Sequence, residues 1–265
     1  MVDRPAADAA FLVVVPTLDS HALLAPLVAS LQQQTHGRWR LLFIDGPSGP
    51  DHRQALADLC RQDPRLAWVV QEPGDPGIYG AMNQGFRAAG PSDWLLFWGS
   101  DDRAADRRVL ARLADRLVSR PDADLLVGRA RYLDHRSGRP GRSSGLAWAG
   151  SLKRSLALGS TPPHQATVFG PAARRRLDRY DTRYRLAADL DYFLTLCRWR
   201  DLLVLHEPLE LVHLGDGGVS ARQTRQRLQE VRQAYRARFG MLWCLPFLLR
   251  YGQRSVSLLV SLLAP

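Results

Sequence analysis

Cysteine and lysine are both scarce in this chain of 265 residues. The three cysteines, Cys60, Cys197 and Cys244, show no paired spacing, so the sequence predicts neither a disulfide framework nor a structural zinc site. This cysteine usage is typical of a reducing compartment. Lys153 is the only lysine, and the other 35 of the 36 basic residues are arginine, a bias that either GC-rich coding or a functional choice would produce.

Long apolar runs are also missing. The longest uninterrupted apolar stretch, Met241 to Leu249, is far shorter than the roughly 20 residues that cross a bilayer. The first ten residues, MVDRPAADAA, lack a basic segment followed by an apolar one, so we expect no secretory signal and a cytoplasmic location. A composition of 46% hydrophobic and 23% charged residues is that of a folded globular protein.

Acidic residues are nearly absent from the last part of the chain. From Gly218 to Pro265, eight arginines accompany a single acid, Glu230, so this segment supplies +7 of the net charge of +10. Such a segment predicts an anionic partner, either lipid headgroups or nucleic acid. Residues 222–240 read as a basic helix, and the apolar residues 241–265 place arginines beside aromatic side chains, as at the interface of an anionic leaflet. The alternative is a helix pair that docks on the rest of the protein or forms a dimer.

Apolar, β-rich runs alternate with helix-like stretches through the first half of the chain. Strands are predicted at residues 11–17, 39–45, 66–72 and 94–100, and helices at 21–34, 51–62, 78–89 and 106–118. Continuous apolar strands with helices between them indicate an α/β fold with a mostly parallel sheet covered on both faces. The spacing fits successive βαβ units.

The second half is less regular. It predicts strands at residues 123–134 and 164–170, a flexible polar loop at 136–145, a helix at 186–199 and an extended segment at 202–214. No clear linker and no internal repeat interrupt the chain, so a single domain with an irregular second half is the economical interpretation.

Polar residues and carboxylates follow all four strands of the first half. Because ligands of open α/β sheets bind beyond the carboxyl ends of the strands, these residues predict a functional rim. They are Pro16, Thr17 and Asp19; Asp45; Glu72 and Asp75; and Asp101 and Asp102. The adjacent Asp101 and Asp102 repel each other unless a positive charge lies nearby. They predict either a bound cation or the N-cap of the helix that follows.

Seven ordered motifs resemble family 2 glycosyltransferases of the GT-A fold, in the branch that builds bacterial surface polysaccharides. Over most of residues 11–240 the motifs are VVVPTLDS, FIDGPSGPD, EPGDPGIYGAMNQGF, FWGSDD, HQATVFG, YRLAADLDYFLTL and GGVS. The resemblance implies a Rossmann-like, mostly parallel sheet. It also implies inverting transfer of a sugar from a nucleotide-diphosphate sugar to an acceptor hydroxyl, with Mn²⁺ or Mg²⁺ as cofactor.

The resemblance, together with the composition of the last part of the chain, predicts a domain organisation and partners. Residues 1–217 would form the catalytic domain, and residues 218–265 a basic, amphipathic helical segment associated with a membrane surface. The acceptor would be a polyprenyl-linked or other glycan, reached at the inner face of the plasma membrane. The partners expected are the donor, the acceptor and an anionic membrane surface, with no nucleic acid.

The donor site can be assigned residue by residue from the resemblance. Asp102 would contact the metal ion, and Asp101 would face the ribose or support its neighbour. Asp45 would meet the nucleotide base, or alternatively would form a turn in the loop DGPSGP. Pro16, Thr17 and Asp19 would form another wall, and Asp75 would lie near the base and ribose. Two departures from the family pattern are Pro76, where lysine is frequent, and Gly80, where an acid is frequent.

The transfer step requires a base that accepts the proton of the acceptor hydroxyl. The resemblance assigns this role to Asp189, although Ala188 replaces the acid that usually precedes it; a helix N-terminal acid is the structural alternative. Acceptor or diphosphate contacts are expected from His164, Gln165, Asp191, His213 and Arg222.

Three other functions are alternatives to this assignment. A nucleic-acid-binding protein would not need a carboxylate rim, which repels phosphates. A nucleotidyltransferase usually has a glycine-rich, basic loop after its first strand, where this chain has PTLDSHALL. A degenerate family member that serves as a membrane-associated scaffold is the remaining alternative, because of Ala188 and Gly80.

Overall fold

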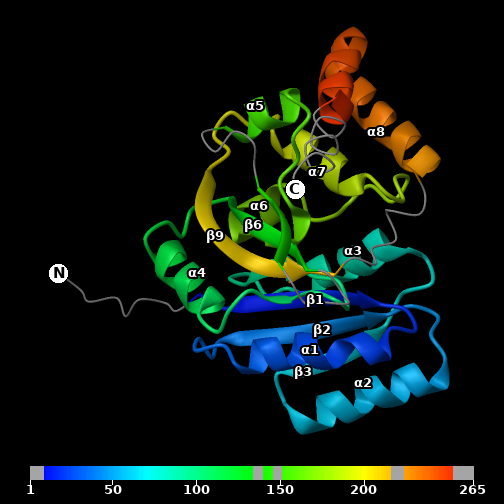
Figure 1. The fold of residues 1–265 in the computed structure, drawn as a ribbon, viewed down its shortest axis with the longest axis vertical. Helices are drawn as coiled ribbons and strands as arrows, with labels where there is room; N and C mark the ends of the chain where they lie inside the picture. Colours follow the sequence, from blue (N-terminus) through cyan, green and yellow to red (C-terminus); the bar gives the residue numbers. More distant parts are fainter. Residues whose placement is uncertain (1–8, 134–139, 146–150, 216–223, 253–265) are drawn as a thin grey trace, which may run out of the picture.

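A computed structural model of the chain describes residues 9–133, 140–145, 151–215 and 224–252 (Figure 1). The strands are β1 (Phe11–Thr17), β2 (Trp39–Asp45), β3 (Leu66–Val70), β4 (Trp94–Phe97), β5 (Arg103–Ala104), β6 (Leu125–Leu133), β7 (Pro140–Ser144), β8 (Thr167–Phe169) and β9 (Val204–Leu214). The α-helices are α1 (His21–Gln32), α2 (Pro50–Gln62), α3 (Ile78–Ala88), α4 (Val109–Val118), α5 (Leu152–Ala157), α6 (Pro171–Arg176), α7 (Ala188–Leu196) and α8 (Thr224–Phe239).

The described strands form one mixed sheet in the order β3-β2-β1-β4-β8-β6-β9-β5, with β7 paired to β6. The first four strands are parallel, as the sequence predicts, and Thr17 lies opposite Asp45 where β1 and β2 end. The α/β fold with a mostly parallel first half is therefore confirmed. β8 runs antiparallel to both of its neighbours, β4 and β6.

Two hydrophobic cores lie on opposite faces of the sheet. Along β1, Phe11, Val13 and Val15 pack in one core with α1, α2 and α4, whereas Leu12 and Val14 pack in the other core with α3, α7 and α8. This alternation follows from the two-residue period of a strand. In Figure 1, α1 and α2 lie on one side of the sheet and α3 on the other.

Several element boundaries differ from the sequence prediction. The loop predicted at 136–145 contains β7, which pairs with β6 through Ala130 and Ser144, so partner strands stabilise a polar sequence of low strand propensity. His164 and Gln165 do not begin a strand but form a 3₁₀ turn, η1 (His164–Ala166), before β8. The described residues contain no helix that is long and apolar enough to cross a membrane.

The basic helix α8 packs on the domain. Its buried residues Val231, Ala234 and Tyr235 lie in the same core as α7. A second 3₁₀ turn, η3 (Gly240–Trp243), and a helix at residues 244–252 follow it. The proposed division at residue 217 lies within residues 216–223, outside the described ranges, and stays a prediction.

Candidate functional site

Asp45, the last residue of β2, organises the loop that follows it. Its Oδ1 atom accepts hydrogen bonds from Thr17 Oγ1 (3.3 Å) and Ser48 Oγ (2.6 Å), and its Oδ2 atom accepts one from Arg53 Nε (3.1 Å). The carboxylate has no exposed surface, whereas the Arg53 side chain is 41% exposed. A nucleotide base therefore reaches Oδ2 only if Arg53 moves aside. The hydrogen bond from Ser48 already gives Asp45 the turn-forming role in the loop that follows β2.

His52 is the remaining group beside this carboxylate. Its Nε2 atom lies 3.2 Å from Asp45 Oδ1 without the alignment of a hydrogen bond. Burial lowers the pKa of His52, and the nearby Asp45 opposes this effect only in part. His52 is therefore a neutral imidazole behind the Asp45 carboxylate. Arg53 supplies the positive charge in contact with that carboxylate.

The loop after β1 connects this cluster to the acidic pair. Asp19 has a positive φ of 46°, a conformation that asparagine and aspartate adopt more readily than other non-glycine residues. Its Oδ1 atom accepts from the Gly49 backbone N–H at 2.8 Å, and its own N–H donates to Ser48 Oγ at 3.0 Å. The next residue, Ser20, lies 2.8 Å from Ser100 between the hydroxyl oxygens. The ends of β1, β2 and β4 are thus joined by side-chain contacts.

The carboxylates of Asp101 and Asp102 converge over Gly99. A Cβ atom at Gly99 would lie 3.0 Å from Asp101 Oδ1 and 3.3 Å from Asp102 Oδ2, so a side chain at this position would fill the space that the two groups border. Mg²⁺ and Mn²⁺ prefer oxygen ligands, and one or two carboxylates are sufficient when substrate phosphates complete the coordination. The donor set and the side-chain-free space above Gly99 fit such an ion.

Asp102 is buried and lies beside a like charge. The pKa of Asp102 is raised to about 8, first by burial and then by the Asp101 carboxylate, and the backbone N–H groups of Gly99 and Gly215 oppose this rise. The Gly99 N–H donates to Asp102 Oδ2 at 2.6 Å. Among the described residues, no salt bridge joins Asp102 to a basic side chain. In the same part of the chain, no group of three or more His, Cys, Asp or Glu side chains is arranged to hold a metal ion. The pair therefore offers two carboxylate groups, fewer ligands than a closed metal site has.

The loop before α3 is held by its own backbone and by two amide side chains. Gln71 Nε2 donates to the carbonyl oxygens of Asp75 (2.8 Å) and Gly77 (2.7 Å), and Asn83 Nδ2 donates to Asp75 Oδ2 at 3.0 Å. A Cβ atom at Gly80 would overlap the Asp75 carbonyl oxygen. The acid that is frequent at this position in the family is thus excluded here because the loop backbone occupies its place.

Asp189 lies in the first turn of α7 and is connected to α3. The hydroxyl of Tyr79 donates to Asp189 Oδ1 at 3.1 Å. Burial and the nearby Asp189 carboxylate raise the pKa of Tyr79 well above its usual value, so Tyr79 remains a neutral hydrogen-bond donor at neutral pH. The candidate base is therefore oriented by a residue of the motif GIYGAMNQG.

His164 belongs to the same cluster. Its ring stacks on Phe97 of β4, with centroids 5.6 Å apart, and its Nε2 atom lies 2.7 Å from the Tyr180 hydroxyl. Burial lowers the pKa of His164, and Asp189 is the charge that opposes this shift. Asn83 Oδ1 accepts from the Tyr180 backbone N–H at 2.6 Å. A polar network thus leads from the donor loop through Asn83 and Tyr180 to His164, beside the candidate base.

A carboxylate from α8 holds the start of α7. Glu230 Oε2 accepts the backbone N–H groups of Leu186 (2.7 Å) and Ala187 (3.1 Å), and Glu230 Oε1 accepts from Gln226 Nε2 at 2.9 Å. Glu230 is only 7% exposed. Because unpaired N–H groups at a helix start need acceptors, this carboxylate fixes the turn that carries Asp189.

Asp191 lies two residues beyond Asp189 and is partly buried. The pKa of Asp191 is raised to about 6. Burial is the main cause, Asp181 contributes to the rise and Arg183 opposes it. Gln165 contributes its backbone carbonyl, which accepts from Trp98 Nε1 at 3.0 Å. The roles of Asp191 and Gln165 as acceptor contacts remain predictions.

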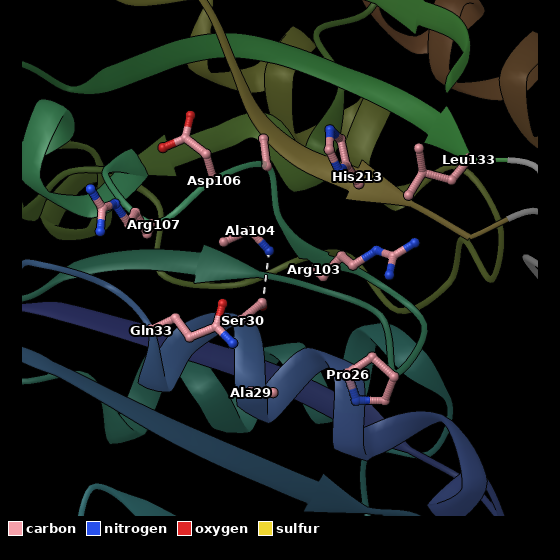
Figure 2. A pocket seen from close by; sticks show the side chains of 11 residues that line it. Pro26, Ala29, Ser30, Gln33, Arg103, Ala104, Asp106, Arg107, Leu133 and His213 are labelled. Carbon is pink, nitrogen blue, oxygen red and sulfur yellow. Dashed lines mark hydrogen bonds between the residues drawn. The ribbon is translucent and has the colours of Figure 1, made fainter. Parts of the chain in front are cut away.

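His213 points into a pocket of about 530 Å³ between α1, β5 and β9 (Figure 2). It lies opposite Arg103 in the pairing of β5 with β9, and its Nε2 atom is 3.7 Å from Glu210 Oε2. Burial lowers the pKa of His213 despite the Glu210 carboxylate. Its suggested approach to the metal or phosphates stays a prediction, and Arg222 lies outside the described residues.

Tyr180 and Glu230 were not identified from the sequence. Tyr180 lies in the stretch DRYDTRY, which carries no motif, and its contacts arise only from the fold. Glu230 could have been singled out as the one acid among eight arginines. Both residues position other side chains at the site.

Two solved structures with bound nucleotide sugars have a similar architecture. Staphylococcus aureus TarS 1-349 in complex with UDP-GlcNAc gives a TM-score of 0.67 at 18% identity and covers 85% of this chain and 65% of that one. The mannosyltransferase PcManGT from Pyrobaculum calidifontis, in complex with GDP-Man and Mn²⁺, gives 0.63 at 15% identity, covering 93% and 73%. At these identities the similarity shows the GT-A-like fold.

Curated relatives are mycobacterial. A PGL/p-HBAD biosynthesis glycosyltransferase of Mycobacterium tuberculosis is 29% identical over 183 residues, 69% of this chain and 67% of the relative. An uncharacterised glycosyltransferase of the same organism is 33% identical over 162 residues, 61% of this chain and 58% of the relative. This chain thus spans about two thirds of the length of the first relative.

The sequence model of glycosyl transferase family 2 matches residues 12–178. This range contains β1 except its first residue, β2 to β4, the loop with Asp75, the pair Asp101 and Asp102, and His164. The chain belongs to glycosyl transferase family 2.

Proposed function

We propose that this protein transfers a sugar, with inversion, from a nucleotide-diphosphate sugar to a hydroxyl group of a glycan or glycolipid acceptor. The observation that carries the proposal is the convergence of the Asp101 and Asp102 carboxylates over Gly99, at the strand ends where open α/β sheets bind ligands. Family membership and solved relatives in complex with UDP-GlcNAc and with GDP-Man support a nucleotide-sugar donor.

The donor site would comprise the ends of β1, β2 and β4. Asp102, supported by Asp101, would hold Mn²⁺ or Mg²⁺, which when bound supplies positive charge opposite the diphosphate. Pro16, Thr17 and Asp19 would form a wall for the nucleotide. Asp45 keeps the loop 46–49 in place and would offer Oδ2 to a base N–H once Arg53 moves aside, while Asp75 would lie near the ribose.

Asp189 would act as the general base. As the acceptor oxygen attacks the anomeric carbon, the new C–O bond forms, the bond to the diphosphate oxygen breaks, and the leaving diphosphate keeps the electron pair. Asp189 accepts the hydroxyl proton. Tyr79 holds Oδ1 of Asp189, which leaves Oδ2 for the proton.

The acceptor would meet the polar groups around the base. His164, Gln165 and Asp191 are the candidate contacts, and His213 and Arg222 are candidates for the diphosphate side. The printed function of the mycobacterial relatives, in PGL/p-HBAD biosynthesis, supports an acceptor of the cell envelope. A polyprenyl-linked or similar lipid-linked acceptor would bring the enzyme to the inner face of the plasma membrane.

A donor panel tests the proposal. Binding and hydrolysis of UDP-, GDP- and dTDP-sugars are measured with and without Mn²⁺, on the wild type and on Asp102→Ala. We expect metal-dependent recognition of one nucleotide class that the variant loses. Indifference of the wild type to every nucleotide and to metal would overturn the enzyme assignment and favour a scaffold.

A further inference from the structure

Four large apolar side chains are exposed together after α8. Met241 is 94% exposed, Leu242 71%, Leu245 59% and Leu248 67%. Leu245 and Leu248 are three residues apart in the helix at 244–252, a spacing that places side chains on one face of a helix. Met241 and Leu242 lie in η3, directly before that helix. Exposed apolar residues are normal when they are scattered singly, but a cluster within eight residues marks an interaction surface.

The opposite face of the same segment is already occupied. Trp243, Phe247 and Tyr251 pack against the core that contains α7 and α8, and their rings contact one another at centroid distances of 5.5 and 4.9 Å. Arg250 fixes the helix through Nη1, which donates to the Gly159 carbonyl at 3.2 Å. The aromatic side chains that the sequence predicted at a membrane interface thus pack against the rest of the protein. The exposed side chains of this segment are aliphatic.

The neighbouring helix α8 carries a row of exposed arginines. The guanidinium of Arg232 lies 5.0 Å from the ring centroid of Trp243, which places one α8 arginine beside η3. Arg225 and Arg236 share the helix face of Arg232 by their spacing of seven and four residues, and all three are exposed. Aliphatic side chains beside a row of arginines match a bilayer interface, where acyl chains lie beneath anionic headgroups.

We propose that Met241, Leu242, Leu245 and Leu248, flanked by Arg225, Arg232 and Arg236, form the surface with which the protein docks on an anionic lipid bilayer. This surface deepens the proposed function, because it would present the catalytic domain to a lipid-linked acceptor, but its test requires no catalysis. The four aliphatic side chains enter the acyl boundary and the arginines contact lipid phosphates.

Vesicle co-sedimentation tests the docking surface. The full chain is mixed with vesicles of phosphatidylcholine alone or of phosphatidylcholine with phosphatidylglycerol. We expect binding only to the anionic vesicles, weakened by salt. Arg225→Gln with Arg236→Gln should lower the affinity by roughly tenfold or more, since each basic residue near the surface contributes about fivefold. Leu245→Ser with Leu248→Ser should abolish binding, whereas Val118→Ser, at another exposed apolar position, should leave it unchanged.

Cys244 gives a second, local measurement. It is exposed and adjoins Leu245, whereas burial raises the pKa values of Cys60 and Cys197 to about 11. Alkylation of the native chain should therefore occur first at Cys244, and anionic vesicles should protect it. Donor hydrolysis by the leucine variant in vesicle-free buffer should equal that of the wild type, which separates a failure of docking from a failure of the enzyme assignment.

Three outcomes would overturn the proposal. One is vesicle binding that the leucine variant retains. Another is a stable dimer, seen by light scattering, that dissociates in the leucine variant, which would assign the face to a second copy. The last is a monomer that binds no anionic vesicle, which would mean that another part of the chain covers the face.

Discussion

Asp189 and Asp102 are both carboxylates close to the candidate site, yet their surroundings suit different tasks. Asp189 is partly exposed, and Tyr79 donates a hydrogen bond to its Oδ1 atom. The Oδ2 atom is therefore the one that would accept a proton. Asp102 is buried beside Asp101 with backbone N–H donors, an environment in which a bound cation stabilises the charge. The environment of each carboxylate thus agrees with its proposed role.

Replacing Asp189 with asparagine should remove the proton acceptor and keep its size. We expect kcat to fall by about 10²–10⁴-fold, the usual contribution of a general base, with the donor Kd changed little. Steady-state transfer and calorimetric donor binding measure the two quantities. Asp191→Asn is the matched control and should lower kcat much less; equal losses in both variants would contradict the assignment of Asp189.

Replacing Asp102 with asparagine should raise the stability of the metal-free protein and remove its response to Mn²⁺ with nucleotide. Because the pKa of Asp102 is raised to about 8 in the metal-free folded protein, folding at neutral pH requires this side chain to take up a proton. Asparagine removes that cost, so the metal-free variant should melt roughly 5 °C or more above the metal-free wild type at about pH 7–8. Mn²⁺ with nucleotide should raise the Tm of the wild type but not of the variant. Thermal melting in chelator and in Mn²⁺ measures both effects, and a metal-free variant that melts below the wild type would argue against a raised pKa of Asp102 in the folded protein.

Asp191 predicts a pH dependence of stability. Its pKa is raised to about 6 in the folded protein from 3.8 in the unfolded chain, so the folded state binds the proton more tightly. The contribution of Asp191 to stability should therefore be lost as the pH rises from about 4 to 6. Asp191→Asn lacks this group, and its Tm should exceed that of the wild type by a growing margin over that interval and a constant one above it.

The sequence identified residues at the site more readily than their partners. Asp45, Asp75, Asp101, Asp102 and Asp189 stand in motifs or directly after strands, so their type and position predicted a role. Tyr180 could not be predicted, because its contacts with Asn83 and His164 span 97 and 16 residues along the chain and exist only once β4, η1 and α3 have packed.

At the scale of elements, the parallel strands were the most predictable part. Their continuous apolar runs require burial on both faces, and the structure places β1 and β2 at the predicted residues. The strand β7 was not predictable from Pro140–Ser144, because β6 supplies its hydrogen-bond partners. The cap on α7 was not predictable from the sequence either, because Glu230 lies 44 residues along the chain from Leu186.

Glu230 should control the helix that carries the base. Glu230→Ala leaves two backbone N–H groups without their acceptor, and we expect a loss of about 1–3 kcal/mol in the free energy of unfolding and a lower kcat with donor Kd unchanged. Glu230→Gln retains an acceptor oxygen and should recover most of the kcat. Chemical denaturation and transfer kinetics measure these effects. An alanine variant with wild-type kcat would show that the cap does not orient Asp189.

At the scale of the whole molecule, one sheet separates two cores, so damage on either face should affect the entire protein. Val13 and Val14 are adjacent in β1, both fully buried, and belong to different cores. Val13→Ala and Val14→Ala should each cost about 1–3 kcal/mol and shift a single cooperative transition. Far-ultraviolet circular dichroism and tryptophan fluorescence should give coincident midpoints; separate midpoints would mean that the two layers unfold independently.

Asp189 depends on two helices that follow the region matched by the family model. That region ends at residue 178, whereas α7 carries the candidate base and α8 supplies its cap. A hybrid enzyme that joins the nucleotide-binding half of this chain to the acceptor half of a relative must therefore exchange α7 and α8 as one unit. A crossover between them would separate the base from the carboxylate that holds its helix, even if every motif of the donor half were kept.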